Sequence, residues 1–303
     1  MQVYCARCVN VSCNMANSEI IGAGQDKTAR RAPKINTITC GDCLEVMQTI
    51  LDKSVDMILC DLPYGTTACK WDTIIPFEPL WEQYKRIIKD NGAIVLTASQ
   101  PFTSALVMSN IKDFRYEIIW EKERPTNIFF LKKQIAKYHE NILVFYSKQP
   151  IYNPQMVKRE GNHSQKEKEY DLTKCNNNGS KTHLKQTYAY SKDYNPELVY
   201  PKSVLKINRD RQKDAHPTQK PVALFEYLIR TYTNEGCTIL DNCIGSGTTA
   251  IACINTGRNY IGIEKEEKYC RIAEERIHAL RSPAQDTKEI CHTAPNSGRD
   301  AIP

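Results

Sequence analysis

Apolar residues along the chain form two kinds of run: short continuous runs typical of buried strands, and longer runs with helical spacing. In the first half of the chain the two kinds alternate, which is typical of a parallel sheet with helices on both faces. The pattern predicts the strands Asn36–Cys40, Val55–Cys60, Ala93–Thr97, Tyr116–Trp120 and Asn141–Tyr146 and the helices Cys43–Leu51, Phe77–Lys89 and Pro101–Ser109.

The alternation stops near residue 150 and resumes after residue 215. The segment between them is polar and rich in Lys, Asn and Tyr, which predicts a small inserted domain or a long loop. Beyond it the pattern predicts the helices Val222–Tyr232, Thr248–Asn255 and Glu266–Leu280 and the strands Thr238–Leu240 and Tyr260–Ile263.

One sheet is therefore expected to form from two separate stretches, residues 36–149 and 216–281, with residues 150–215 inserted between them. Residues 1–35 have no sustained periodicity and predict a flexible leader. Residues 282–303 contain few apolar side chains and predict a disordered tail.

The composition, 41% hydrophobic and 25% charged, is that of a globular protein and excludes collagen-like, coiled-coil and wholly disordered chains. The net charge of +6 is concentrated in two places. Residues 1–35 carry 5 Lys and Arg against 2 Asp and Glu, and residues 150–215 carry 13 against 8 with six tyrosines. Such a basic, aromatic segment suits a polyanion with stackable bases, although a solvated insertion without a partner has the same composition.

The 13 cysteines have no regular spacing, and the sequence contains no secretory signal and no membrane-spanning run. We therefore expect free thiols in a reducing compartment, the cytoplasm of a prokaryote or phage host or the nucleus of a eukaryote. Cys5, Cys8, Cys40 and Cys43 have the spacing of four zinc ligands. Because Cys40 and Cys43 bracket a Gly-Asp turn at the end of a predicted strand, we expect no metal.

A glycine-containing turn follows the strand that ends at Leu240, in the order Asp241-Asn242-Cys243-Ile244-Gly245-Ser246-Gly247-Thr248. A strand, a Gly-x-Gly turn and a helix bring a nucleotide-like ligand close to backbone amides. The turn lacks the Gly-Lys-Ser/Thr of a phosphate loop, which argues against a triphosphate. The next strand runs into Glu264, a position from which a carboxylate can bind both hydroxyls of a ribose.

A second motif, Asp61-Leu62-Pro63-Tyr64, directly follows the apolar run that ends at Cys60. Asp61 and a loop carbonyl can accept hydrogen bonds from an amino group on a planar ring, and Tyr64 can stack on that ring. In isolation, a proline-containing turn after a strand explains the same residues.

Together the motifs resemble those of the S-adenosylmethionine-dependent DNA amino-methyltransferases of the permuted β group. In that family an Asp-Pro-Pro-Tyr motif precedes the glycine loop and a target-recognition region lies between them, which is the order found here over residues 36–281. The resemblance implies a Rossmann-like, mostly parallel α/β sheet, S-adenosylmethionine as cofactor and double-stranded DNA as substrate, acted on by a monomer or homodimer. It also implies that the target base is flipped out of the duplex.

The resemblance assigns Asp61, Leu62, Pro63 and Tyr64 to the target base, with Leu62 offering a backbone carbonyl where the family has its first proline. It assigns residues Asp42, His216, Lys220, Asp241, Gly245, Gly247, Thr248 and Glu264 to the cofactor. Tyr138-His139-Glu140-Asn141 resembles a motif near the flipped base. The chain departs from the family at Leu62 and at Asn242-Cys243, where Pro-Phe is usual.

Asp rather than Ser at the first position of the catalytic motif favours adenine N6 over cytosine N4 as the methylated atom. Three other functions remain open from the sequence: an RNA or protein-glutamine methyltransferase, a catalytically silent DNA-binding regulator, and a nucleotide-binding oxidoreductase. In the first of these the glycine loop usually precedes the catalytic loop, the reverse of the order here.

Overall fold

The computed structural model describes residues 34–67, 72–159, 195, 197–210 and 219–281. The predicted leader and tail fall almost entirely outside these ranges, as do His216 and most of the predicted insertion. None of the helices in the described part of the chain is long and apolar enough to cross a membrane.

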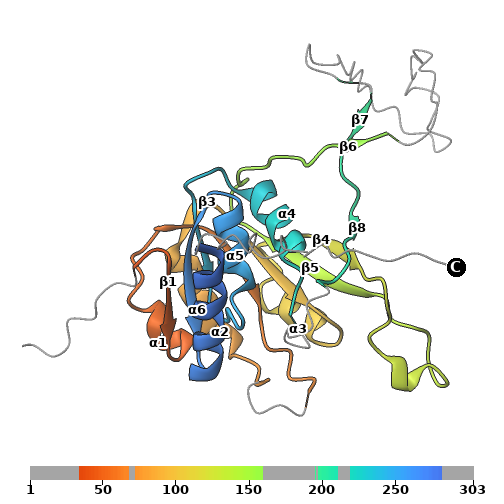
Figure 1. Ribbon diagram of the computed structural model, residues 1–303, viewed down its shortest axis with the longest axis horizontal. Coiled ribbons are helices and arrows are strands. Elements are labelled where there is room, and N and C mark those ends of the chain that lie inside the picture. The colour runs from red at the N-terminus through yellow and green to blue at the C-terminus, as the bar shows by residue number, and fades with distance from the viewer. Residues whose placement is uncertain (1–33, 68–71, 160–194, 196, 211–218, 282–303) are drawn as a thin grey trace, which may run out of the picture. The chain divides into compact units, whose positions relative to one another are not determined.

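The described residues contain ten strands and six α-helices, which alternate except from β4 to β8, where no α-helix intervenes. Figure 1 shows their arrangement. The strands are β1 (Thr37–Cys40), β2 (Val55–Asp61), β3 (Ile88–Ala98), β4 (Phe114–Glu121), β5 (His139–Phe145), β6 (Val157–Lys158), β7 (Leu198–Val199), β8 (Val204–Lys206), β9 (Thr238–Asp241) and β10 (Asn259–Glu264). The helices are α1 (Cys43–Met47), α2 (Phe77–Ile87), α3 (Phe102–Ser109), the short 3₁₀ helix η1 (Ile128–Phe130), α4 (Val222–Tyr232), α5 (Thr248–Asn255) and α6 (Glu267–Arg281).

Eight strands form one sheet in the order β1-β10-β9-β2-β3-β5-β4-β8, and β6 pairs with β7 separately. The five strands from β1 to β3 are parallel, whereas β5 is antiparallel to both of its neighbours. The mostly parallel α/β sheet predicted from the sequence is therefore confirmed. Strand β8 lies in the segment predicted as an insertion and pairs with β4 in the main sheet.

Residues along each central strand point alternately to opposite faces of the sheet. Because apolar residues lie on both faces, both must be covered, and helices cover them. In β2, Ile58 and Cys60 pack in the cluster that contains residues of α1, α2 and α3. Met57 and Leu59 pack in the other cluster, with α4, α5 and Ile277 of α6. The near-continuous apolar sequence of β2 thus reflects burial on both faces.

Strands β9 and β2 lie side by side in the sheet although about 180 residues separate them in the chain. From β9 the chain crosses through α5 to β10 on one side, and from β2 it crosses through α2 to β3 on the other. In open α/β sheets a ligand binds at the carboxyl ends of the two strands where the chain diverges in this way. This position lies beside Asp61 and Asp241.

The sequence placed Lys89 at the end of a helix, but the helix ends at Ile87 and β3 begins at once at Ile88. Pairing with β2 overrides the local pattern, since Ile88 lies opposite Val55. The ammonium of Lys89 lies 2.7 Å from Asp56 Oδ1, and the other oxygen of Asp56 accepts a hydrogen bond from Thr238 N of β9 at 2.9 Å. Asp56 thereby connects β2 to both of its neighbours.

Gly92 gives the first test of this packing. A Cβ atom added there would lie 2.8 Å from the backbone oxygen of Asp56 and 2.6 Å from Ile88 Cγ1. We expect Gly92→Ala to lower the free energy of unfolding by about 1–3 kcal/mol, because the backbone of β2 must move. The exposed neighbour Asn91 is the control. Asn91→Ala should change the free energy of unfolding by less than about 0.5 kcal/mol. Urea unfolding measures both variants, and equal values would contradict the contact.

Candidate active site

Asp61 is the last residue of β2, and its carboxylate lies at the centre of a hydrogen-bonded cluster. Oδ2 lies 2.6 Å from the ammonium of Lys220. Oδ1 accepts a hydrogen bond from Tyr64 at 2.8 Å and another from Thr97 Oγ1. Thr97 reaches Asp61 because the two residues lie opposite each other in the pairing of β2 with β3.

Lys220 lies between two carboxylates and is only 7% exposed. Its Nζ atom is 3.4 Å from Glu140 Oε2, and Glu140 Oε1 forms an ion pair with Lys122, which is 5% exposed. Two ammonium groups and two carboxylates therefore alternate, and we call Asp61, Lys220, Glu140 and Lys122 the charged cluster. Alternation offsets the cost of removing each charge from water.

The pKa values within the charged cluster follow from this arrangement. Burial alone would lower the pKa of Lys220, but Asp61 and Glu140 outweigh it and hold that pKa above its ordinary value. Burial would raise the pKa of Glu140, but Lys220 and Lys122 hold it below its ordinary range. Burial does lower the pKa of Lys122, against the attraction of Glu140.

Tyr64 contributes a neutral hydroxyl, since burial first and the charge of Asp61 second raise its pKa well above the ordinary value. Its ring stacks on Phe102, with centroids 5.2 Å apart and an interplanar angle of 26°, and Lys220 Nζ lies 5.5 Å from the ring centroid. The contact with a base that the resemblance assigns to this ring stays a prediction.

The loop after Tyr64 is held by Asp72, a residue that the sequence did not single out. Its carboxylate accepts hydrogen bonds from the backbone amides of Gly65, Thr66 and Thr67 at 2.7–2.9 Å. Burial would raise the pKa of Asp72, but a hydrogen bond from the Thr67 side chain and those from the three amides lower it below its ordinary value. Leu62 is buried, and its apolar side chain packs in the same core cluster as α2 and α3.

The glycine loop follows β9 as predicted, and its two glycines adopt positive φ angles, +52° at Gly245 and +85° at Gly247. Gly247 also lacks room for a side chain, because an added Cβ would lie 3.0 Å from Ala273 Cβ in α6. Helix α5 begins directly afterwards at Thr248. Both the conformation and the close approach require glycine here.

Asp241 is almost fully buried, and its carboxylate organises this loop. Oδ1 accepts a hydrogen bond from Cys243 N at 3.0 Å, and Oδ2 accepts one from Thr249 Oγ1. Burial raises the pKa of Asp241 to about 7. The structure thus gives Asp241 a role in positioning the loop, and the cofactor contact that the resemblance assigns to it stays a prediction.

Glu264 ends β10, and each of its carboxylate oxygens accepts one backbone hydrogen bond at 2.9 Å, from Gly245 N and from Glu266 N. Burial raises its pKa. The backbone amide of Lys265 also contributes a hydrogen bond to this carboxylate. A carboxylate offers about four acceptor sites, so acceptor capacity is left for a hydroxyl of a ribose. The residues at this position therefore fit a nucleoside.

Asp42 lies at the end of β1, next to Glu264, whose backbone oxygen accepts a hydrogen bond from Gly41 N at 2.8 Å. The carboxylate of Asp42 caps helix α1 through Leu44 N at 2.9 Å and lies 3.6 Å from Lys265 Nζ. The side chain remains 42% exposed, which leaves it accessible to a ligand.

The resemblance assigned both Lys220 and His216 to the cofactor, but the structure describes only Lys220. His216 lies outside the described residues. Lys220 forms ion pairs with Asp61, at the end of β2, and with Glu140, at the start of β5. The neighbouring Gln219 connects this segment to the glycine loop, because its Oε1 accepts a hydrogen bond from Ser246 Oγ at 3.0 Å.

The thiol of Cys243 contacts those of Cys43 and Cys60, and the seven cysteines in the described residues are free. Burial raises the pKa of Cys60 to about 12, so this thiol stays protonated at neutral pH. In the described residues no group of three or more His, Cys, Asp or Glu side chains is arranged to hold a metal. Cys5 and Cys8 lie outside those residues.

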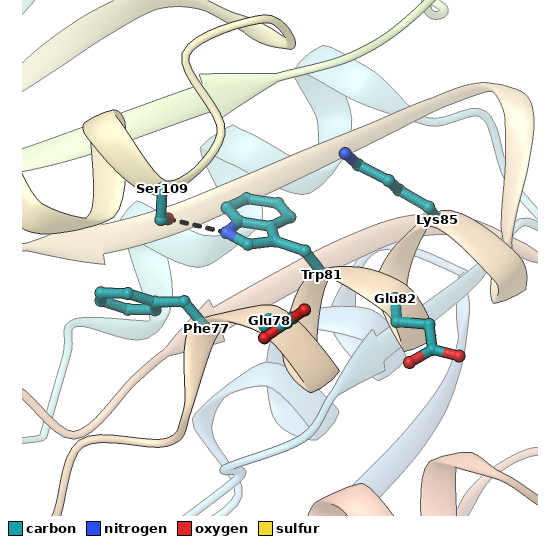
Figure 2. Close-up of a pocket in the computed structure, with 6 residues that line it drawn as sticks. All are labelled: Phe77, Glu78, Trp81, Glu82, Lys85 and Ser109. Carbon is teal, nitrogen blue, oxygen red and sulfur yellow. Dashed lines mark hydrogen bonds between the residues drawn. The ribbon is translucent and has the colours of Figure 1, made fainter.

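A groove of about 560 Å³ lies elsewhere on the surface, along α2, and none of the predicted site residues lines it. Figure 2 shows Phe77, Trp81 and Lys85 along it, with Trp81 Nε1 donating a hydrogen bond to Ser109 Oγ at 2.8 Å. Because the groove contains none of the motif residues, the candidate site is the edge of the sheet where β2 and β9 end, and not this groove.

The raised pKa of Asp241 predicts a pH dependence of stability. An unfolded aspartate loses its proton near pH 4, whereas the folded one keeps it to about pH 7. The folded state therefore binds the extra proton between these values, and stability falls as pH rises through them. Relative to Asp241→Asn, the wild type should lose on the order of 1.4 kcal/mol per pH unit between pH 5 and 7.

Urea unfolding at several pH values, without added nucleotide, checks this difference. Glu264 is present in both proteins, so its own raised pKa cancels. Asp52→Asn, at a side chain that is 71% exposed, is the control and should show the wild-type pH dependence. A pH-independent difference between the wild type and Asp241→Asn would show that Asp241 is ionised throughout.

Comparison with known proteins identifies the family of the chain. A family model described as DNA methylase matches residues 55–275, which include the Asp61–Tyr64 motif, the glycine loop and Glu264. Type II methyltransferase M.HinfI of Haemophilus influenzae is 27% identical over 283 residues, covering 83% of this chain and 71% of that protein. Type II methyltransferase M.HpaI of Haemophilus parainfluenzae is 26% identical, covering 88% of this chain and 81% of that protein.

Solved structures of similar fold include M1.HpyAVI in complex with SAM, 25% identical with a TM-score of 0.51, covering 79% of this chain and 98% of that one. The PvuII DNA methyltransferase, described as cytosine-N4-specific, has a TM-score of 0.57 at 14% identity, covering 86% of this chain and 90% of that one, and supports the fold alone. Since the family model spans well over half of the sequence and both motifs, this chain belongs to the DNA methylase family.

Proposed function

We propose that the protein transfers a methyl group from S-adenosylmethionine to the N6 atom of an adenine flipped out of duplex DNA. The observation that carries the proposal is the position of Asp61 at the carboxyl end of β2, beside the glycine loop that follows β9. An acceptor for an amino group and a fitting nucleoside site thus lie at the same edge of the sheet.

The residues of the site suit the activation of an exocyclic amino group. That nitrogen is a poor nucleophile while its lone pair is conjugated with the base. Hydrogen bonds from its two N–H groups to Asp61 and to the Leu62 carbonyl draw it towards tetrahedral geometry and localise the lone pair. S-adenosylmethionine would supply a methyl group made electrophilic by the sulfonium: as the bond from nitrogen to the methyl carbon forms, the bond from that carbon to sulfur breaks, S-adenosylhomocysteine leaves and the amino group releases one proton.

Asp61 is held for this task by unequal partners. Lys220, which is almost fully buried, fixes Oδ2 through an ion pair, while the side chain of Asp61 stays 28% exposed. At Oδ1 the donors are hydroxyls, and Tyr64 can donate instead to Thr97 Oγ1, which lies 3.0 Å away. Because a hydroxyl can redirect its proton, Oδ1 is the oxygen that can exchange a partner for the amino group of a base.

Asp61→Ala should abolish methyl transfer, with activity reduced at least about 1,000-fold, while affinity for S-adenosylhomocysteine stays within about threefold of wild type. Radiolabelled transfer to duplex DNA and calorimetric titration measure the two quantities. The control Asp90→Ala removes an aspartate that is 59% exposed and should retain full activity. Equal loss of transfer and of cofactor affinity would contradict the assignment of Asp61 to the base.

Adenine is proposed as the target because Asp, and not Ser, begins the catalytic motif. Mass spectrometry of nucleosides from DNA methylated by the wild type should detect N6-methyladenine. Detection of N4-methylcytosine would overturn the choice of base and leave the methyltransferase assignment intact. Radiolabel in RNA alone would favour an RNA methyltransferase. Absence of label together with retained DNA binding would favour a catalytically silent regulator.

A further inference from the structure

The segment between β4 and β5, residues 122–138, emerges at the catalytic edge of the sheet. Strand β5 is antiparallel to β3, and Asn141 lies opposite Ala98. The start of β5 therefore lies beside the end of β3, next to the Asp61–Thr97 pair. We call residues 124–137 the β4–β5 loop; in Figure 1 it leaves β4, passes through the short helical turn η1 and returns to β5.

The tip of this loop holds large apolar side chains in solvent. Phe129 is 98% exposed, Ile135 is 91% exposed, and Ile128 and Phe130 are each more than half exposed. A single exposed apolar residue needs no explanation, but several adjacent ones mark a binding surface. The loop thus presents an aromatic and aliphatic tip at the edge where the substrate is expected.

The rest of the β4–β5 loop is basic. It contains Arg124, Lys132, Lys133 and Lys137 and no acidic residue. Cations beside exposed aromatic side chains suit a nucleic acid, in which phosphates attract the cations and a separated base step accepts an apolar wedge. A second protein surface would need to supply acidic groups around an apolar socket.

The loop is also fixed relative to the site. Asn127 closes its neck, donating from Nδ2 to Ile135 O at 2.9 Å and accepting at Oδ1 from Lys137 N at 2.8 Å. Lys137 Nζ lies 2.5 Å from Ser99 Oγ, directly after β3. Lys122 and Glu140, which flank the loop, belong to the charged cluster around Asp61. A duplex bound at the tip is therefore positioned relative to Asp61.

We propose that the β4–β5 loop inserts Phe129 into the duplex beside the target base and stabilises the flipped state. The inference rests on the proposed function, since only an enzyme that acts on a base inside a duplex needs such a wedge. Insertion replaces stacking that the flipped base loses, so the wedge matters most when the target base is paired.

The test compares two DNA substrates that contain the methylated site, one fully paired and one with an abasic position opposite the target. Phe129→Ala should lower kcat/KM on the paired duplex at least about tenfold and on the abasic duplex less than about threefold. Fluorescence of 2-aminopurine at the target position should report less flipping in the paired duplex alone. Phe129→Trp should restore both quantities, and affinity for S-adenosylhomocysteine should not change.

Leu51→Ala is the matched control, because Leu51 is a large apolar side chain, 68% exposed, at the other end of β2. Equal activity of Phe129→Ala and wild type on both substrates, or equal loss on both, would overturn the wedge. If Phe129→Ala instead changes the mass measured by sedimentation and affects both substrates equally, the wedge is overturned, and the loop tip contacts a second copy of the chain. If the wild type methylates no duplex DNA at all, so that no methylated site can be found, the proposed function itself is overturned, and the wedge with it.

Discussion

The parallel pairing of β2 with β9 is the contact on which the rest of the site depends. It joins residues about 180 positions apart, with Met57 opposite Ile239 and Ile58 opposite Leu240. Both strands are buried, and their register is fixed at the opposite end by the hydrogen bond from Thr238 N to Asp56. The loops after the two strands are therefore adjacent, which brings Asp61 beside the glycine loop.

The charged cluster connects this pair of strands to the rest of the molecule. Its four members come from the end of β2, the end of β4, the start of β5 and the segment before α4. Because each charge is largely withdrawn from water, losing one partner leaves another buried and unpaired, which costs several kcal/mol. An arrangement of the four segments that breaks one of these pairs is therefore penalised, so the cluster selects one arrangement more than it adds net stability.

The sequence was sufficient to predict nearly all elements of the main sheet, since they are long, periodic and punctuated by glycine and proline. It failed at Lys89, where pairing across the sheet extends β3 into residues that resemble a helix end and a turn. Asp61, the glycine loop and Glu264 could be found because each follows an apolar run directly. Thr97 and Lys122 could not, because their roles arise from strand register and from contacts between distant segments. A polar Thr97 inside the otherwise apolar run of β3 was the one available signal.

Strand β8 is the last strand in the sheet and pairs with β4 alone. After β5, which lies inside the sheet between β3 and β4, the chain therefore rejoins the sheet at its outer strand, away from the β2–β9 contact. Since the entropy of closing a loop grows only with the logarithm of its length, this connection tolerates large changes in size at little cost. The pairing of β2 with β9, and with it the arrangement of the loops at their carboxyl ends, therefore does not depend on how long the connection between β5 and β8 is.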